Sequence, residues 1–345
     1  MRWAFPYDVF ILPLPERLLI SKIGSTVRAA SLRKQLKLAH AGEVVLGMGD
    51  DCAVIRTAPG HEILVTTDFS LEGVHFRREW HGPESVGHRC LARGLSDIAA
   101  MGAEPTAAFL SLALPVKTRQ AWIDGFMRGL LKLADEFGVT LAGGDTAQSP
   151  SAILADIVVL GSIPKGKAIL RSGARPGDKI YVTGTLGGSA AALHRLFSKK
   201  TKLNPKQFRS HFFPIPRIRV GEFLGKHKIP SAMIDLSDGL STDLSHICES
   251  SGVGAKIYLP AIPLARVGHP LRPVDLKFAL HGGEDYELLF TAPANRKVPS
   301  EIEGVLITCI GQITKNKQIV SVHEGGVRSI LRPAGWQHFR KSRPR

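Results

Sequence analysis

MIDLSDGLSTDL, residues 233–244, carries the pattern that decides the fold. An apolar strand, predicted for Ala232–Asp235, runs through a turn rich in Gly and Ser into a helix predicted for Thr242–Ser250. A carboxylate at the end of a strand points into a loop crevice, where open α/β sheets bind ligands. The turn and its borders carry three such groups, Asp235, Asp238 and Asp243. The stretch predicts a mixed α/β or α+β protein with an acidic site beside its strands.

Further aspartates sit in similar surroundings earlier in the chain. VVLGMGDDCAVI carries Asp50 and Asp51, EILVTTDFS carries Asp68, LAGGDT carries Asp145, and GLSDIAAMG adds Asp97 within a helix. An Asp at a turn is as often a structural cap as a ligand, so each one alone is weak. Several carboxylates in one crevice, however, repel one another unless a cation lies between them. Oxygen ligands without Cys or His favour Mg²⁺ or Mn²⁺, and the usual reason to gather Mg²⁺ is a polyphosphate. A nucleotide-dependent phosphotransferase is therefore the leading class.

Hydrophobic periodicity alternates strands and helices along the chain, and 345 residues suit two domains of roughly 150 residues each. The polar, Gly- and Pro-rich segment KGKAILRSGARPGD, residues 165–178, is the best boundary. We expect an extension over residues 1–20, a first domain over 21–164 and a second over 165–345. Strands are expected at 44–46, 53–55, 63–67, 107–114, 139–142, 153–162, 179–183, 232–235, 255–259, 286–291 and 304–313, with helices at 85–101, 120–137, 189–197 and 242–250.

The net charge of +15 is concentrated in one zone. Residues 161–230 hold 15 Lys and Arg against two acids, a net of +13, so the rest of the chain is near neutral. Such a run is more often a solvated face than a binding site. No aromatic residues alternate with it at stacking spacing, so nucleic acid is not expected as a partner.

The four cysteines and the N-terminus bear on location. The cysteines lie far apart without a CxxC pair, which is typical of a reducing cytoplasm. Near the N-terminus, Asp8 and three prolines limit the apolar run to about six residues, too short for a signal peptide or a membrane span. We expect a cytoplasmic protein without a membrane partner.

Phosphate-binding loops give a weaker signal. The chain has no GxxxxGK[ST], and no GxGxxG follows a strand. VTGTLGGSAAAL, residues 182–193, runs from a strand through three glycines into a helix, and its backbone N–H groups could hold a phosphate. A plain tight turn with a helix cap explains this stretch equally well.

Eight motifs in order make the chain resemble a known family. They are GMGDDCAVI, TTDFSLEGVHF, GLSDIAAMGAEP, LAGGDT, LRSGARPGD, YVTGTLGGSAAAL, IDLSDGLSTDL and GGEDYELLFT. Together they resemble the thiamine-monophosphate kinase family, in the superfamily of aminoimidazole ribonucleotide synthetase. The resemblance runs from about residue 43 to GWQHF, residues 335–339. It implies a two-domain fold in which the N-terminal sheet pairs with that of a second copy into a barrel, beside an α+β C-terminal domain.

The resemblance also implies the reaction and its residues. The γ-phosphoryl group of ATP would pass in line to the phosphate of thiamine monophosphate, giving thiamine diphosphate in a homodimer that uses several Mg²⁺ ions. Metal ligands would be Asp51, Thr66, Thr67, Asp68, Asp97, Asp145, Asp235 and Asp238, of which Asp68, Asp97, Asp145 and Asp235 would be catalytic. ATP would contact Gly144, Asp145, Arg171 and Ser237. Thiamine monophosphate would contact His75, Glu284 and Trp336.

Related families remain as alternatives. An aminoimidazole ribonucleotide synthetase would not explain GWQHF or the VHF motif. A selenophosphate synthetase would carry a reactive Cys near its N-terminus, whereas the first Cys here is Cys52, and a hydrogenase-maturation dehydratase would end in Cys rather than Arg345. A basic nucleic-acid-binding protein on an inactive kinase fold is a further alternative, which the retained acids disfavour.

Overall fold

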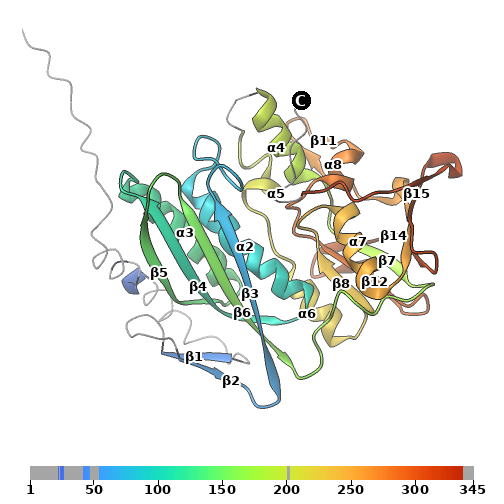
Figure 1. Cartoon of the computed structure of the whole chain (residues 1–345), viewed down its shortest axis with the longest axis horizontal. Coiled ribbons are helices and arrows are strands. Elements are labelled where there is room, and N and C mark those ends of the chain that lie inside the picture. The colour runs from blue at the N-terminus through green and yellow to red at the C-terminus, as the bar shows by residue number, and fades with distance from the viewer. Residues whose placement is uncertain (1–21, 23, 27–41, 47–53, 200–202, 337–345) are drawn as a thin grey trace, which may run out of the picture.

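The computed structural model describes residues 22, 24–26, 42–46, 54–199 and 203–336. Asp50, Asp51 and the expected extension over residues 1–20 lie outside the described residues. Within them, the chain forms two halves, each built on its own β-sheet, that lie side by side (Figure 1).

The first half contains a four-stranded sheet covered on one face by two helices (Figure 1). The strand order is β3 (His61–Leu71), β6 (Leu154–Pro164), β4 (Glu104–Pro115) and β5 (Thr140–Ser149). Helices α2 (Pro83–Ala100) and α3 (Gln120–Glu136) cover the inner face. Buried and partly exposed positions alternate along most of β6 and the second half of β4, as expected for strands with one buried face. A separate antiparallel pair joins β1 (Gly42–Leu46) and β2 (Val54–Thr57).

Two glycines set the spacing of the helix pair. A Cβ added at Gly87 would lie 1.9 Å from the carbonyl oxygen of Phe126, and one added at Gly129 would lie 1.9 Å from that of Glu84. The helix backbones therefore touch at both positions. This close approach leaves α2 buried along most of its length, its two arginines included.

The second half is built on an eight-stranded mixed sheet. Its strands run in the order β16 (Arg328–Ile330), β15 (Ile319–Val322), β9 (Gly254–Tyr258), β14 (Val305–Thr314), β7 (Lys179–Thr183), β12 (Leu288–Ala292) and β8 (Ala232–Asp235), with β13 (Glu301–Ile302) paired to β14. The helices are α4 (Gly188–Lys199), α5 (Arg209–Phe212), α6 (Ile218–Lys226), α7 (Leu240–Ser251) and α8 (Leu276–His281). A short ribbon pairs β10 (Arg266–Val267) with β11 (Arg272–Pro273), and single 3₁₀ turns occupy Leu259–Ala261 and Glu324–Gly326.

The two halves share one hydrophobic core. Leu91 and Leu95 of α2 belong to the same buried cluster as Met233 of β8 and Phe290 of β12. Strand β8 is the edge of the second sheet, and it lies against α2. Because α2 contacts both sheets, side chains on this helix can meet groups from either half.

The expected mixed α/β fold is confirmed, and β7 and β8 have the predicted limits residue for residue. One premise was wrong: Asp68 and Asp145 do not end their strands, because β3 and β5 continue to Leu71 and Ser149. The segment 165–178 separates β6 from β7, and the domain limits stay a prediction. In the described part of the chain, no helix is both long and apolar enough to cross a membrane.

Candidate functional site

Three carboxylates from three elements meet where the halves join. Asp68 lies on β3, Asp97 on α2 and Asp235 at the end of β8. Thr66, two residues before Asp68 and on the same face of β3, donates a short hydrogen bond to Asp97. Ser96 Oγ donates to Asp235 Oδ2 over 2.7 Å. The sequence predicted these acids as one site, and the fold brings them together.

Their mutual repulsion is visible in their pKa values. Burial raises the pKa of Asp68 from 3.8 to about 6, with Asp97 adding to the shift. Burial also raises the pKa of Asp97, against the hydrogen bond from Thr66 and the charge of Arg171. The pKa of Asp235 is raised well above its usual range by burial and then by Asp97. The set has more negative charge than its surroundings neutralise, which is the condition that a bound cation relieves.

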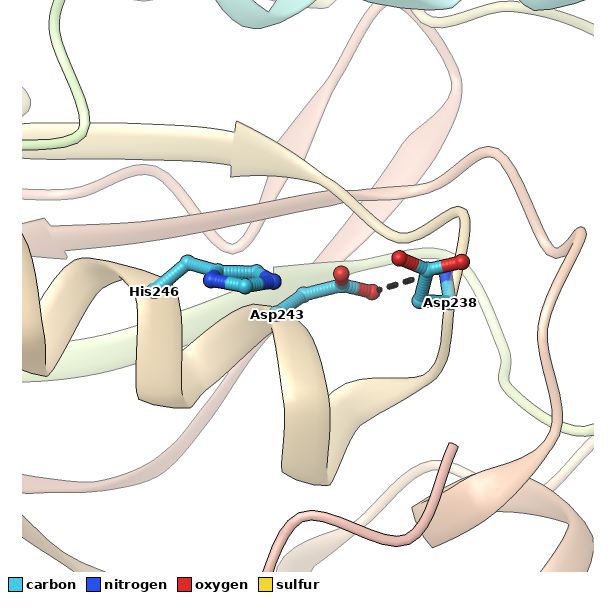
Figure 2. A group of neighbouring side chains, drawn as sticks. All are labelled: Asp238, Asp243 and His246. Atoms are coloured by element: carbon cyan, nitrogen blue, oxygen red, sulfur yellow. Dashed lines mark hydrogen bonds between the residues drawn. The ribbon is translucent and has the colours of Figure 1, made fainter. Parts of the chain in front are cut away.

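A second acidic group follows β8 directly. Figure 2 shows Asp243 and His246 side by side on α7, with Asp238 in the turn before the helix, and one ligand atom from each lies within 4.8 Å of the others. Asp243 accepts hydrogen bonds from the backbone N–H groups of Asp238 and Gly239 at 3.2 and 2.9 Å. Burial and Asp238 raise the pKa of Asp243 to about 8. Asp243 therefore closes the turn that presents Asp238.

Arg171 lies over both acidic groups. Its charge lowers the pKa of Asp97 and that of Asp243, although burial raises both more strongly. The side chain itself is exposed. The predicted ATP-contacting arginine is thus one of the cations that interact with the predicted metal ligands, and Arg93, which lowers the pKa of Asp68, is another.

Glu284 is held by two arginines that lie on the same face of α2 as Asp97. Arg89 Nη2 donates to both Glu284 oxygens over 2.7 Å, and Arg93 donates to Oε1. Burial would raise the pKa of Glu284, but the two arginines outweigh it and lower the value to about 2. His75 also lowers this pKa, so it lies near the carboxylate, while its Nδ1 accepts from the Leu71 N–H. Glu284 is ionised at any physiological pH.

Two further predicted contacts, Ser237 and Trp336, are linked by backbone hydrogen bonds to Glu284 and to Asp238 respectively. The Glu284 N–H donates to the Ser237 carbonyl oxygen over 2.8 Å, and the Trp336 N–H donates to that of Asp238 over 3.1 Å. Trp336 is 52% exposed. Predicted substrate contacts and predicted metal ligands therefore border one another.

Two predicted residues lie elsewhere. Asp145 of β5 lies in one row across the sheet with Ser111 of β4, Asp156 of β6 and Phe69 of β3, each opposite the next. Three strand spacings place Asp145 about 14 Å from β3, and it is exposed on the outer face, away from α2. Thr67 also points outward and donates to Asp156 Oδ1 over 2.8 Å.

Gly144 and Asp51 complete the predicted set. Gly144 has φ 150°, and a Cβ there would lie 1.9 Å from the Leu110 carbonyl oxygen, so β5 requires glycine at this position. Asp51 lies outside the described residues.

The glycine turn before α4 already holds an anion from the chain itself. The Gly187 N–H donates to Asp285 Oδ2 over 2.6 Å, and the Ser189 N–H donates to Oδ1 over 3.4 Å. Two N–H groups of this turn are therefore already bonded within the chain, which favours the tight-turn interpretation of residues 182–193 over the phosphate interpretation. Burial raises the pKa of Asp285 to about 7 despite these bonds.

Sequence reasoning missed the arginines of α2. Arg89, Arg93 and Asp97 are spaced four residues apart, so they share one face of the helix. That spacing was readable in GHRCLARGLSD, but nothing local indicates that Glu284, 195 residues beyond Arg89, is the partner.

Comparisons with known proteins identify the family of the chain. The family described as AIR synthase related protein, N-terminal domain, matches residues 49–163, and the corresponding C-terminal domain family matches residues 175–324. The thiamine-monophosphate kinase of Escherichia coli K12 is 38% identical over 307 residues, which cover 86% of this chain and 93% of that protein.

Solved structures give the same result. The crystal structure of the thiamine-monophosphate kinase from Stenotrophomonas maltophilia K279a superposes with a TM-score of 0.76 at 32% identity, covering 90% of this chain and 97% of that one. AaThiL complexed with AMPPCP and TMP superposes with a TM-score of 0.72 at 28% identity, covering 92% and 97%. Sequence and structure both place this chain in the thiamine-monophosphate kinase family.

Proposed function

We propose that the protein is a thiamine-monophosphate kinase, which transfers the γ-phosphoryl group of ATP to the phosphate of thiamine monophosphate and releases thiamine diphosphate and ADP. The observation that carries this proposal is the meeting of the acids of β3, α2 and β8 near Arg171, with Glu284 held by arginines of the same helix α2. Family membership supplies the substrate.

Mg²⁺ fits the acidic set because every donor in it is an oxygen and the carboxylates are short of positive charge. The ligands would be Asp68, Asp97, Asp235 and Asp238, with Thr66 beside them and Asp51 and Thr67 as further candidates. Bound Mg²⁺ would neutralise charge on the polyphosphate. Arg171 and Ser237 would bind ATP from the second half of the chain.

A homodimer would complete the site. Apolar side chains stand on the outer face of the first sheet, with Val65 66% exposed and Phe69 54% exposed. An apolar sheet face of this kind is normally covered, and a second copy would cover it as a barrel. Asp145 and Gly144 lie on that sheet, so in a dimer they would face the partner subunit and could reach ATP bound there.

Thiamine monophosphate would lie between His75, Glu284 and Trp336. Its cationic ring suits the exposed indole of Trp336, a contact worth about 0.5–2 kcal/mol, and the ionised Glu284 is a hydrogen-bond acceptor. The attacking atom is already an anionic phosphate oxygen, so no protein base is needed. Catalysis then consists of holding two anions in line and offsetting their charge. We place this activity in the cytoplasm, where ATP is available.

The test is incubation with Mg-ATP and thiamine monophosphate while ADP and thiamine diphosphate are measured. We expect equal amounts of both products and none in EDTA. ADP without thiamine diphosphate, or turnover with another acceptor alone, would show that the substrate is wrong. Steep salt-dependent oligonucleotide binding without ATP turnover would instead support the nucleic-acid alternative.

A further inference from the structure

A chain of buried polar side chains crosses the junction behind Glu284. Arg89 and His81 come from the first half, and His211 and Ser189 from the second; all four are at most 3% exposed. His81 Nε2 lies 3.0 Å from Arg89 Nη1 and 3.0 Å from His211 Nε2, and His211 Nδ1 lies 2.9 Å from Ser189 Oγ. The function proposed above gives this chain no role.

The donor and acceptor of every bond follow from Arg89. A guanidinium can only donate, so His81 Nε2 must accept and carries no proton. The neutral ring then has its proton on Nδ1, which donates to the Arg77 carbonyl oxygen over 3.1 Å. This tautomer excludes the alternative bond in which the Arg77 N–H, 3.2 Å from Nδ1, donates to that nitrogen. Because His81 Nε2 carries no proton, His211 Nε2 must be the donor between the two rings, and Arg89 and His211 share the single lone pair of His81 Nε2. His211 Nδ1 then accepts from the Ser189 hydroxyl.

The electrostatics agree with two neutral rings. Burial, followed by the charge of Arg89, lowers the pKa of His81 to about 4 and that of His211 well below its usual range. A proton on either ring would break the order, because each Nε2 has one assigned role. The arrangement therefore persists at neutral pH.

The consequence falls on the guanidinium. Arg89 Nη1 donates to His81, while Arg89 Nη2 donates to both oxygens of Glu284 at 2.7 Å. The guanidinium group therefore cannot rotate without breaking its bonds to both partners. With Arg93 added, arginine donors make three contacts with a carboxylate that offers about four lone pairs. The Glu284 side chain is 23% exposed, which leaves room for one donor from a ligand.

We propose that Arg89, locked by the His81–His211–Ser189 chain, is a positioning residue that aims the Glu284 carboxylate at one hydrogen-bond donor of the acceptor substrate. The inference rests on the proposed function, because that function makes Glu284 a contact of thiamine monophosphate. It adds a specificity device, because a substrate lacking the donor would leave the last acceptor position of the arginine-held carboxylate unfilled. In the proposed function ATP would bind beside Arg171, which makes none of the bonds of the His81–His211–Ser189 chain.

The experiment replaces the acceptor that holds Arg89. His81→Phe keeps an aromatic ring beside Phe212, whose centroid lies 5.4 Å away, but removes Nε2. We expect the KM for thiamine monophosphate to rise about tenfold, the effect of one charge-assisted hydrogen bond, while kcat and the KM for ATP stay within twofold. His81→Gln restores an acceptor and should bring the KM back to within about threefold of wild type. Exposed His227 receives the same exchange to Phe as a matched control and should change nothing.

The outcomes separate the two proposals. If wild type does not phosphorylate thiamine monophosphate, the proposed function fails and this inference fails with it. If wild type is active and His81→Phe leaves the KM unchanged, or lowers kcat and raises both KM values alike, the positioning role is refuted while the function stands. Should His81→Phe fail to fold, Ser189→Ala removes the far end of the chain and must raise the same KM about threefold, without affecting ATP, for the inference to survive.

Discussion

Asp68→Asn should stabilise the protein while removing its activity. Asp68 titrates near 3.8 when unfolded and near pH 6 when folded, because burial and Asp97 disfavour its charge. An acid whose pKa is higher in the folded state contributes its full stability at pH values below its unfolded pKa of 3.8. That contribution to the free energy of unfolding is lost as the pH rises through its folded pKa of about 6. The ionised carboxylate therefore costs folding free energy above about pH 6, and an amide removes that cost.

The magnitude follows from the size of the shift. About two pKa units at 1.36 kcal/mol each give a gain of about 3 kcal/mol for Asn at pH 8 in EDTA, which falls to about 1 kcal/mol at pH 4.5. Kinase turnover should drop by several orders of magnitude, because a predicted metal ligand is lost. Function and stability thus change in opposite directions at one residue.

Urea denaturation of both proteins in EDTA, at pH 8 and at pH 4.5, measures the difference. Asp145→Asn is the matched control: Asp145 is exposed on the outer face, and the exchange should change the free energy of unfolding by less than about 0.5 kcal/mol. If Asp68→Asn is no more stable than wild type at pH 8, or if its advantage does not shrink in acid, the account of an electrostatically strained acidic site is wrong.

Three further changes test other parts of the structure. Trp336→Ala should raise the KM for thiamine monophosphate about two- to thirtyfold but leave that for ATP unchanged in steady-state assays; equal effects on both would contradict the stacking role. Asp285→Ala should lower the free energy of unfolding by about 1–3 kcal/mol in urea, since it leaves the Gly187 and Ser189 N–H groups without their acceptor, whereas Asp285→Asn should cost less. Gly129→Ala should cost about 2 kcal/mol or more by forcing α2 from α3, and Gly82→Ala, where a Cβ meets nothing within 4 Å, should cost under about 1 kcal/mol; equal costs would refute the backbone contact.

The sequence was sufficient where structure is local. Strands β7 and β8 are short, Gly or Ser lies within two residues of each of their ends, and their limits were predicted residue for residue. Strands β3 and β5 run further than expected because their neighbours supply hydrogen bonds through TTDFS and GGDT, which read locally as turns. The ends of such strands are decided by pairing with segments distant in sequence, and the periodicity within one segment carries no information about that pairing.

The site was predictable in its composition but not in its geometry. Residue type identified Asp68, Asp97 and Asp235 as a cation site, and the resemblance added Glu284. Which face each side chain takes depends on register: Thr66 and Thr67 are adjacent in sequence, yet one bonds Asp97 beside α2 and the other bonds Asp156 on the outer face. Asp145 likewise faces away from Asp68, so the proposed metal set, if it includes both, would need a second subunit or the nucleotide itself as a bridge.

The segment HGGEDYELLF, residues 281–290, explains why the site depends on the whole fold. Glu284 reaches back to the arginines of α2, Asp285 caps the turn before α4, and Glu287 accepts from Arg217 and from Thr183 at the end of β7. Three acids within four residues can face three directions because Glu284 and Tyr286 take positive φ values of 65° and 51°. Such backbone costs about 1–3 kcal/mol per residue and persists only where the bonds around it hold it in place. The bonds of the three acids therefore hold the strained backbone of residues 281–290 in place. Loss of the arginine contacts of Glu284 should let this segment relax, and in the proposed function it is the segment that borders thiamine monophosphate.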